Sequence, residues 1–187
     1  LKDQGTELDL DSLISAIRST YNGEELAMTT EEAGQVRKEY IEKRQAEQKA
    51  QATAAGQNNL AEGQKFLAEN ATKEGVQTTE SGLQYKVVTM GDGPKPAATD
   101  TVKVHYRGTL LDGTEFDSSY ARNEPISFGL NRVIAGWTEG VQLMPVGSKF
   151  MFYIAPDLAY GEGGGGPIPP NSTLIFEVEL LDIETAE

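Results

Sequence analysis

The spacing of the apolar residues changes once along the chain, near Ser81. Upstream of this point apolar side chains recur about every 3.6 residues, the period of a helix. Downstream they alternate with polar side chains, which is the period of a strand. Alternation of this kind is typical of antiparallel strands that bury one face. The sequence therefore predicts two unlike parts, a helical region followed by an antiparallel sheet, and the fold class α+β.

Two helices are expected in the N-terminal part. Apolar side chains recur at helical spacing over residues 10–21, and Asp9 is in position to cap this segment. Thr29 begins a capping box, which precedes a proline-free stretch rich in Glu, Lys, Gln and Ala over residues 30–70. The apolar stripe of this second helix is too thin to enter a core along its whole length. This favours a solvent-exposed stalk, with a partly disordered linker as the alternative.

Two glycines interrupt the predicted long helix. Gly56 and Gly63 are each expected to cost about 1 kcal/mol relative to alanine. We expect the helix to continue through them and to end near Asn70. The predicted domains are therefore residues 1–74, a helical region with its stalk, and residues 75–187, the sheet domain. Because Leu1 rather than methionine opens the sequence, we also expect a processed or trimmed N-terminus.

The sheet domain is expected to contain several half-buried strands and one short helix. Residues 149–155 predict a strand, and Asp112-Gly113 is a hairpin signal. Gly136 to Leu143 is the one good helix candidate in this half, so a sheet that curls around this helix is the economical architecture. Alternation predicts further strands at residues 83–87, 102–106 and 174–180.

Composition excludes several classes of site. The formal net charge of −13 disfavours nucleic acid and anionic lipid as partners. The chain has no cysteine and one histidine, which leaves no thiol nucleophile, no thiolate metal site and little for zinc. His105 alternates with Lys103 and Arg107, so we expect it to be an exposed strand residue rather than a catalytic one. No apolar run approaches the roughly 18 residues of a membrane span.

The glycine run at residues 161–166 formally satisfies a Gly-x-Gly-x-x-Gly motif. Prolines follow it instead of a helix N-terminus, and Glu162 would repel phosphate, so a phosphate cradle is disfavoured. We interpret the run as the mobile rim of a pocket. Tyr160, a residue with a polar tip, stands directly before this run.

An apolar pocket around Trp137, the only tryptophan, remains as the candidate site. Core packing is the alternative interpretation for most of the aromatic residues near it. Asp117 is the carboxylate of interest, and its alternative role is that of a strand-end residue bonded to nearby backbone. The aromatic residues are Tyr106, Phe116, Phe128, Tyr160 and Phe176.

Several motifs, in order, resemble an FKBP-type peptidyl-prolyl isomerase domain from about Gly82 to the end of the chain. The helical region and residues 81–85 are similar to the bacterial Mip and FkpA subgroup, whose members add an N-terminal dimerisation domain. The glycine-run loop departs from the pattern, because it is one residue shorter than in single-domain relatives and carries Pro167 where an aliphatic residue often stands. The motifs are Val104-His105-Tyr106-Arg107-Gly108, Gly113-Thr114-Glu115-Phe116-Asp117-Ser118-Ser119, Val133-Ile134-Ala135-Gly136-Trp137, Leu158-Ala159-Tyr160-Gly161, Ile168-Pro169-Pro170-Asn171 and the segment 174–181.

The resemblance implies a five-stranded antiparallel half-barrel wrapped over a short helix, with a proline pocket on Trp137. The Ile134 N–H and the Tyr160 hydroxyl would hold the carbonyls of a bound peptide. Arg122 would be the charged partner of a network between Asp117 and Tyr106. By motif position the catalytic residues would be Tyr106, Phe116, Asp117 and Tyr160, and the substrate-binding residues Phe128, Val133, Ile134, Trp137, Ile168, Phe176 and Arg122.

The activity so implied is rotation of X-Pro bonds, whose amide resonance sets a barrier of about 18–20 kcal/mol. It requires no nucleophile, metal or cofactor. The implied partners are proline-containing unfolded or nascent polypeptides, macrolide inhibitors of the family, and a second copy bound through the N-terminal helices. A non-enzymatic chaperone function of the helical region is the second hypothesis. The implied location is the periplasm, with the cytoplasm as the alternative.

Overall fold

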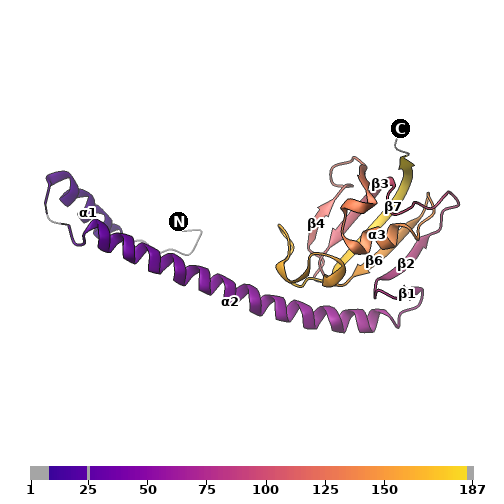
Figure 1. Ribbon diagram of the computed structural model, residues 1–187, viewed down its shortest axis with the longest axis horizontal. Coiled ribbons are helices and arrows are strands. Elements are labelled where there is room, and N and C mark those ends of the chain that lie inside the picture. The colour runs from indigo at the N-terminus through magenta and orange to yellow at the C-terminus, as the bar shows by residue number, and fades with distance from the viewer. Residues whose placement is uncertain (1–8, 25, 185–187) are drawn as a thin grey trace. The chain divides into compact units, whose positions relative to one another are not determined.

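Figure 1 shows the computed structural model, which describes residues 9–24 and 26–184. The expectation of a processed start at Leu1 lies outside these residues. The chain divides into two compact units, Leu1–Lys49 and Ala50–Glu187. One helix, α2 (Thr30–Asn70), runs through the division. The domain boundary predicted after residue 74 stays a prediction.

The N-terminal helices begin where their caps predict. Helix α1 spans Leu10–Asn22, and Asp9 Oδ1 accepts hydrogen bonds of 3.1 Å from the N–H groups of Asp11 and Ser12. In the capping box of α2, the Glu32 N–H donates to Thr29 Oγ1 at 3.2 Å. Helix α2 is continuous, and its residues 30–55 are exposed. These features confirm the solvent-exposed stalk rather than the disordered linker.

Over residues 9–24 and 26–184 the sheet is antiparallel and has seven strands, in the order β1-β2-β6-β7-β3-β4, with β5 paired to β3. The fold class α+β is confirmed. Two short strands, β1 and β5, add to the five that the resemblance implies. The bounds are β1 Val76–Thr78, β2 Gln84–Thr89, β3 Thr101–Thr109, β4 Glu115–Ser118, β5 Ile126–Gly129, β6 Lys149–Ile154 and β7 Leu174–Glu184.

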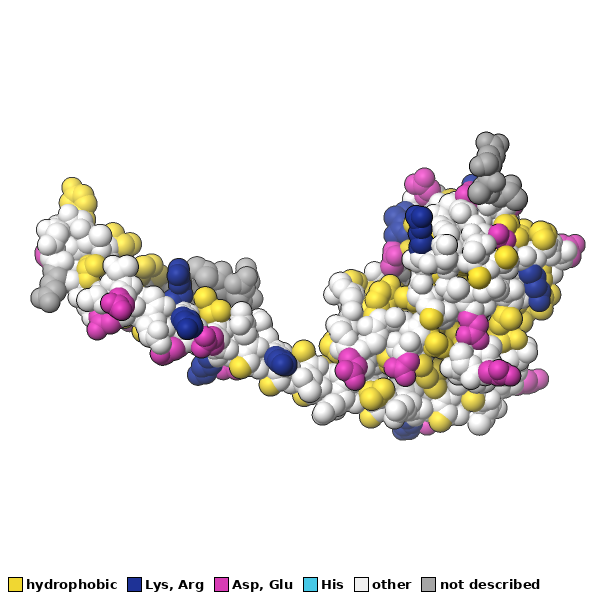
Figure 2. Space-filling model, in the orientation of Figure 1, with side chains coloured by type: hydrophobic (Ala, Val, Ile, Leu, Met, Phe, Trp, Pro, Cys, Tyr) yellow, Lys and Arg dark blue, Asp and Glu magenta, His cyan; other side chains and the backbone are white. Residues whose placement is uncertain are grey.

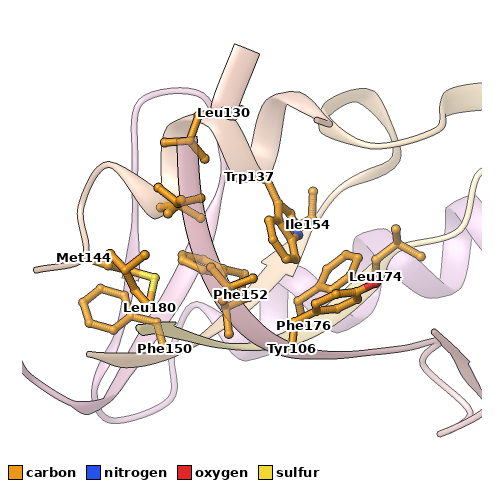
Figure 3. Close-up of a cluster of buried hydrophobic side chains, with 14 of the residues drawn as sticks. Tyr106, Leu130, Trp137, Met144, Phe150, Phe152, Ile154, Leu174, Phe176 and Leu180 are labelled. Atoms are coloured by element: carbon orange, nitrogen blue, oxygen red, sulfur yellow. The ribbon is translucent and has the colours of Figure 1, made fainter. Parts of the chain in front are cut away.

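Helix α3 (Ala135–Val141) covers the concave face of this sheet and forms the core with it (Figure 1). Figure 3 shows Trp137 pointing from α3 toward Ile154, with Tyr106 and Phe176 nearby. Short 3-10 helices follow β5, at Leu130–Arg132, and β6, at Pro156–Leu158 and Gly161–Gly163. The side chains with no exposed surface include Leu83, Val102, Val104, Leu130, Met144, Phe152, Ile154 and Leu174.

The last turns of α2 pack against the sheet domain, and this packing explains where the helix ends. Asn70 is buried and donates to Gln84 Oε1 at 2.9 Å, while Gln84 Nε2 donates to the carbonyl of Leu67 at 2.8 Å. Gly63 is also buried, and a Cβ there would collide with Thr173. Close packing therefore compensates the helix-propensity cost predicted for this glycine.

The prediction that His105 is exposed is wrong. It lies on the outer face of β3 as expected, but it is half-buried. Its ring stacks on Tyr120 at 4.7 Å between centroids, and its Nδ1 lies 2.9 Å from Ser119 Oγ. Both neighbours come from the segment after β4, which alternation within one strand cannot predict.

Among the residues that the structure describes, no helix combines the length and the apolar character that crossing a bilayer requires.

Candidate active site

The structure gathers nearly all the predicted site residues around one cavity of about 270 Å³. Arg122 is the exception: it does not line the cavity but bonds to two residues that do, Asp117 and Tyr106. Gly165 and Pro167 also line the cavity. The resemblance marks Pro167 as a departure from the family pattern, whereas one glycine within a run gives no sequence signal of its own. The predicted residues that line the cavity are Tyr106, Phe116, Asp117, Phe128, Val133, Ile134, Trp137, Tyr160, Ile168 and Phe176.

Trp137 forms the floor of the cavity and is held by three aromatic rings. The centroids of Tyr106 and Phe176 lie 5.3 Å and 5.2 Å from its ring, both in edge-to-face geometry. Phe128 approaches at 5.1 Å with a tilt of 60°. Such pairs are worth about 0.5–1.5 kcal/mol beyond area burial. Strands β3, β5 and β7 thus fix the orientation of a residue that α3 carries.

One backbone donor stands beside the floor, at the start of α3. The Ile134 carbonyl accepts from the N–H groups of Trp137 and Thr138, at 2.9 Å and 3.1 Å. Within the described residues, the Ile134 N–H itself donates to no other group. An N–H at a helix start has no intrahelical acceptor, so it is available to a ligand carbonyl.

A charged network forms one wall. The Tyr106 hydroxyl donates to Asp117 Oδ2, and Arg122 Nη1 donates to Asp117 Oδ1 at 2.5 Å. Arg122 Nη2 also donates to the Tyr106 hydroxyl at 3.1 Å. The carboxylate is therefore bonded to two side chains, as the resemblance implies, rather than serving chiefly as a strand-end residue.

The network keeps Asp117 ionised. Burial of Asp117 acts to raise its pKa, but the hydrogen bonds from Tyr106 and Arg122 outweigh burial and hold the pKa below its usual value. The pKa of Tyr106 is raised, first by burial and then by its hydrogen bond to Asp117. Hydrogen bonds to Asp117 and Tyr106 raise the pKa of Arg122, which stays cationic.

The stability that Asp117 contributes should depend on pH in acid. A carboxyl whose folded pKa is lowered stabilises the fold above its unfolded pKa of about 3.9, and this contribution is lost as pH falls through the folded pKa. Urea unfolding of the wild type and Asp117→Asn should show a constant wild-type advantage above about pH 5, which shrinks below about pH 4. Asp157→Asn, at an exposed position in the 3-10 helix Pro156–Leu158, controls for the loss of one charge. An advantage that persists unchanged at about pH 2 would contradict the depressed pKa.

The rim of the cavity comes from the loop between β6 and β7. Tyr160 stands at the mouth with 45% of its surface exposed. Its ring packs so closely on Gly165 that a Cβ there would lie 2.8 Å from it. Gly165 and Ile168 exchange two backbone hydrogen bonds of 2.9 Å, which place the Ile168 side chain in the cavity.

Two family models match this chain. The model for FKBP-type peptidyl-prolyl cis-trans isomerase matches residues 93–181, and the model for the domain amino terminal to such isomerases matches residues 1–87. FkpA of Aeromonas hydrophila is 54% identical, covering 98% of this chain and 68% of the relative. The outer membrane protein MIP of Legionella longbeachae is 40% identical, covering 99% of this chain and 80% of the relative.

A solved structure agrees with these matches over the whole chain. The crystal structure of FkpA from Escherichia coli superposes with a TM-score of 0.82 at 40% identity, covering 100% of this chain and 87% of that one. Its similarity extends over both the helical and the sheet parts. The chain therefore belongs to the FKBP-type peptidyl-prolyl cis-trans isomerases and is an enzyme of that type.

Proposed function

We propose that the cavity above Trp137 is the catalytic site, and that it binds X-Pro segments of unfolded or nascent polypeptides. The observation that carries this proposal is the composition of the cavity: aromatic rings on several sides, the Ile134 N–H, which has no acceptor among the described residues, and one fixed carboxylate. In the proposed roles, Tyr106, Phe116, Asp117 and Tyr160 act on the rotating amide. Phe128, Val133, Ile134, Trp137, Ile168 and Phe176 bind the proline and its neighbours, while Arg122 holds Asp117.

The proposed mechanism is selective stabilisation of the twisted amide. A twisted amide has lost its conjugation, so a dry pocket that fits its shape favours it over either planar form. Phe116 and Phe176 meet edge to face at 5.5 Å. Ring edges carry partial positive charge, which suits a rotated carbonyl oxygen. The Ile134 N–H and the Tyr160 hydroxyl would hold the peptide carbonyls, and lowering the barrier by about 7 kcal/mol would give roughly 10⁵-fold acceleration.

Removing the Tyr160 hydroxyl tests the proposed carbonyl contact. Tyr160→Phe is expected to lower kcat/KM about fivefold to tenfold in a protease-coupled assay with a short X-Pro peptide, the effect of one lost hydrogen bond. Tyr153→Phe is the matched control, because Tyr153 packs on Phe66 outside the cavity. Equal rates for the wild type and Tyr160→Phe would remove the hydroxyl from the proposed mechanism.

We further propose that the N-terminal helices pair two copies of the chain, and that the dimer acts as a chaperone. The observation that favours pairing is the apolar face of α1, whose side chains are largely exposed within the part of the chain that the structure describes (Figure 2). Ile17 is 60% and Tyr21 90% exposed. A short amphipathic helix with no partner for its apolar face is marginally stable in water. The other members of this face are Leu10, Leu13 and Ile14.

Charges placed on the apolar face of α1 should separate the copies. Ile14→Glu with Ile17→Glu is expected to sediment as a monomer, because burying two carboxylates at an interface is costly. Suppression of aggregation should weaken with it, while peptide isomerisation is retained. Gln48→Glu with Gln51→Glu, both exposed on α2, tests for effects of added negative charge alone. A wild-type chain that sediments as a monomer would contradict the pairing.

Location and inhibitors are proposed from the relatives and from the cavity. We propose the periplasm, supported by the name of the Legionella relative, with the cytoplasm as the alternative; fractionation of the native host distinguishes them.

Macrolide inhibitors of the family are expected to occupy the cavity, because its lining is mainly apolar and aromatic. Competition between such an inhibitor and an X-Pro peptide would show this.

A further inference from the structure

The rim of the cavity is attached to the stalk helix. Asn59, on α2, donates from Nδ2 to the carbonyl of Pro170 at 2.8 Å. One turn earlier Gly56 is buried, and a Cβ on it would lie 3.1 Å from Pro170 Cβ and 3.3 Å from Asn171 Nδ2. The absence of a side chain at Gly56 therefore lets the helix approach the rim closely enough for Asn59 to reach it.

Pro170 is joined to the cavity by a short path of backbone contacts. Ile168, two residues before it, is 6% exposed and lines the cavity. The N–H of Asn171, the next residue, donates to the Gly161 carbonyl at 2.9 Å, which closes the loop directly after Tyr160. Pro170, which accepts from Asn59, thus lies two residues after Ile168. The residue after it, Asn171, bonds to Gly161, the neighbour of Tyr160.

This loop has few side chains that could fix its conformation. It contains five glycines between Tyr160 and Pro167, and Gly161, Gly164 and Gly166 have positive φ. Glycine loses more conformational freedom on ordering than any other residue, so a glycine run gains most from a contact outside itself. The contacts within the loop include the hydrogen bonds between Gly165 and Ile168.

We propose that Asn59 is a positioning residue for the isomerase reaction, and that with Gly56 it holds the rim so that Ile168 and Tyr160 face the bound peptide. The inference rests on the proposed function of the cavity. Ile168 and Tyr160 are placed against peptide in both its planar and its twisted states, so a loosened rim weakens binding in both. The effect of losing Asn59 therefore falls mainly on KM rather than on kcat.

The experiment compares the full chain with Asn59→Ala, Asn59→Asp and the matched control Asn58→Ala. Asn58 is the exposed neighbour on the same helix, and alanine suits a helix at either position. Amide hydrogen exchange by NMR reports the rim through Gly165, Ile168 and Asn171, and the core through Phe152 and Val178. Peptide isomerisation is measured over a range of substrate concentrations to separate KM from kcat.

In Asn59→Ala we expect rim exchange to accelerate about threefold to tenfold, the range set by one lost hydrogen bond, with core exchange unchanged. KM should rise by a similar factor with kcat nearly constant. Asn59→Asp keeps the size but has no donor and faces a carbonyl, so its effects should be larger, while Asn58→Ala should match the wild type.

Unchanged rim exchange in both Asn59 variants would overturn the inference, as would equal acceleration in the core. Faster rim exchange with unchanged KM would overturn it too. In that last case Tyr160→Phe separates the causes. If Tyr160→Phe loses activity, the cavity remains the proposed site and only the role of Asn59 is rejected. If Tyr160→Phe keeps full activity, the proposed role of the cavity is rejected as well.

Discussion

Replacing Trp137 with alanine is expected to lower kcat/KM for an X-Pro peptide by about two orders of magnitude, which is about 2.7 kcal/mol of transition-state stabilisation. The indole is 4% exposed and closes the floor of the cavity. Without it the edge-to-face contacts with Tyr106 and Phe176 are lost, and water can enter beneath the proline ring. A wet, wider pocket no longer favours the twisted amide over the planar forms.

The same substitution should destabilise the fold by about 3–5 kcal/mol, so activity has to be measured where circular dichroism shows the variant folded. Phe150→Ala controls for that destabilisation, because Phe150 is 1% exposed, packs on Tyr85 and Phe152, and lies outside the cavity. We expect Phe150→Ala to lose similar stability and to keep its kcat/KM. Trp137→Phe, which retains an aromatic floor, should fall between the wild type and Trp137→Ala. A folded Trp137→Ala with activity within about threefold of the wild type would contradict the proposed floor.

Local signals in the sequence were sufficient for the helix starts, whereas the set of cavity residues required the family resemblance. Asp9 and Thr29 cap helices because their side chains bond N–H groups two or three residues away, a distance that sequence spacing reports directly. The cavity residues followed from ordered motifs of a known family, which carry tertiary information that periodicity does not. Trp137 and Tyr106 come from elements far apart in sequence, and no propensity would have paired them.

The features that the sequence did not predict depend on contacts between distant segments. Gly56 was interpreted only as a helix-propensity cost, because its partner Pro170 lies more than 110 residues away. Strand β1 has 3 residues and β5 has 4, too few for alternation to be recognised. Tyr120, which half-buries His105, belongs to a turn after β4. In each case tertiary packing decides what local pattern leaves open.

Adding one methyl group at Gly140 is expected to lower the free energy of unfolding by about 2–3 kcal/mol. In an exposed helix the change to alanine is favourable by about 1 kcal/mol. Gly140, however, is buried on α3, and a Cβ there would lie 2.6 Å from Cε1 of Phe152, a ring with no exposed surface. Gly34→Ala in α2, where a Cβ meets nothing within 4 Å, is the matched control and should stabilise the chain. Urea unfolding measures both.

The collision is with one side chain, so a smaller residue at position 152 should relieve it. Phe152→Leu alone is expected to destabilise by about 1–2 kcal/mol, while the double variant should lose less than the sum of the two single losses. Because α3 also carries Trp137, Gly140→Ala should raise KM for peptide, and Phe152→Leu should partly restore it in the double variant. If the free-energy losses of the two single variants add exactly in the double variant, Phe152 is not the group with which the added methyl group at position 140 collides. If KM for peptide is unchanged in Gly140→Ala, the cavity floor tolerates displacement of α3.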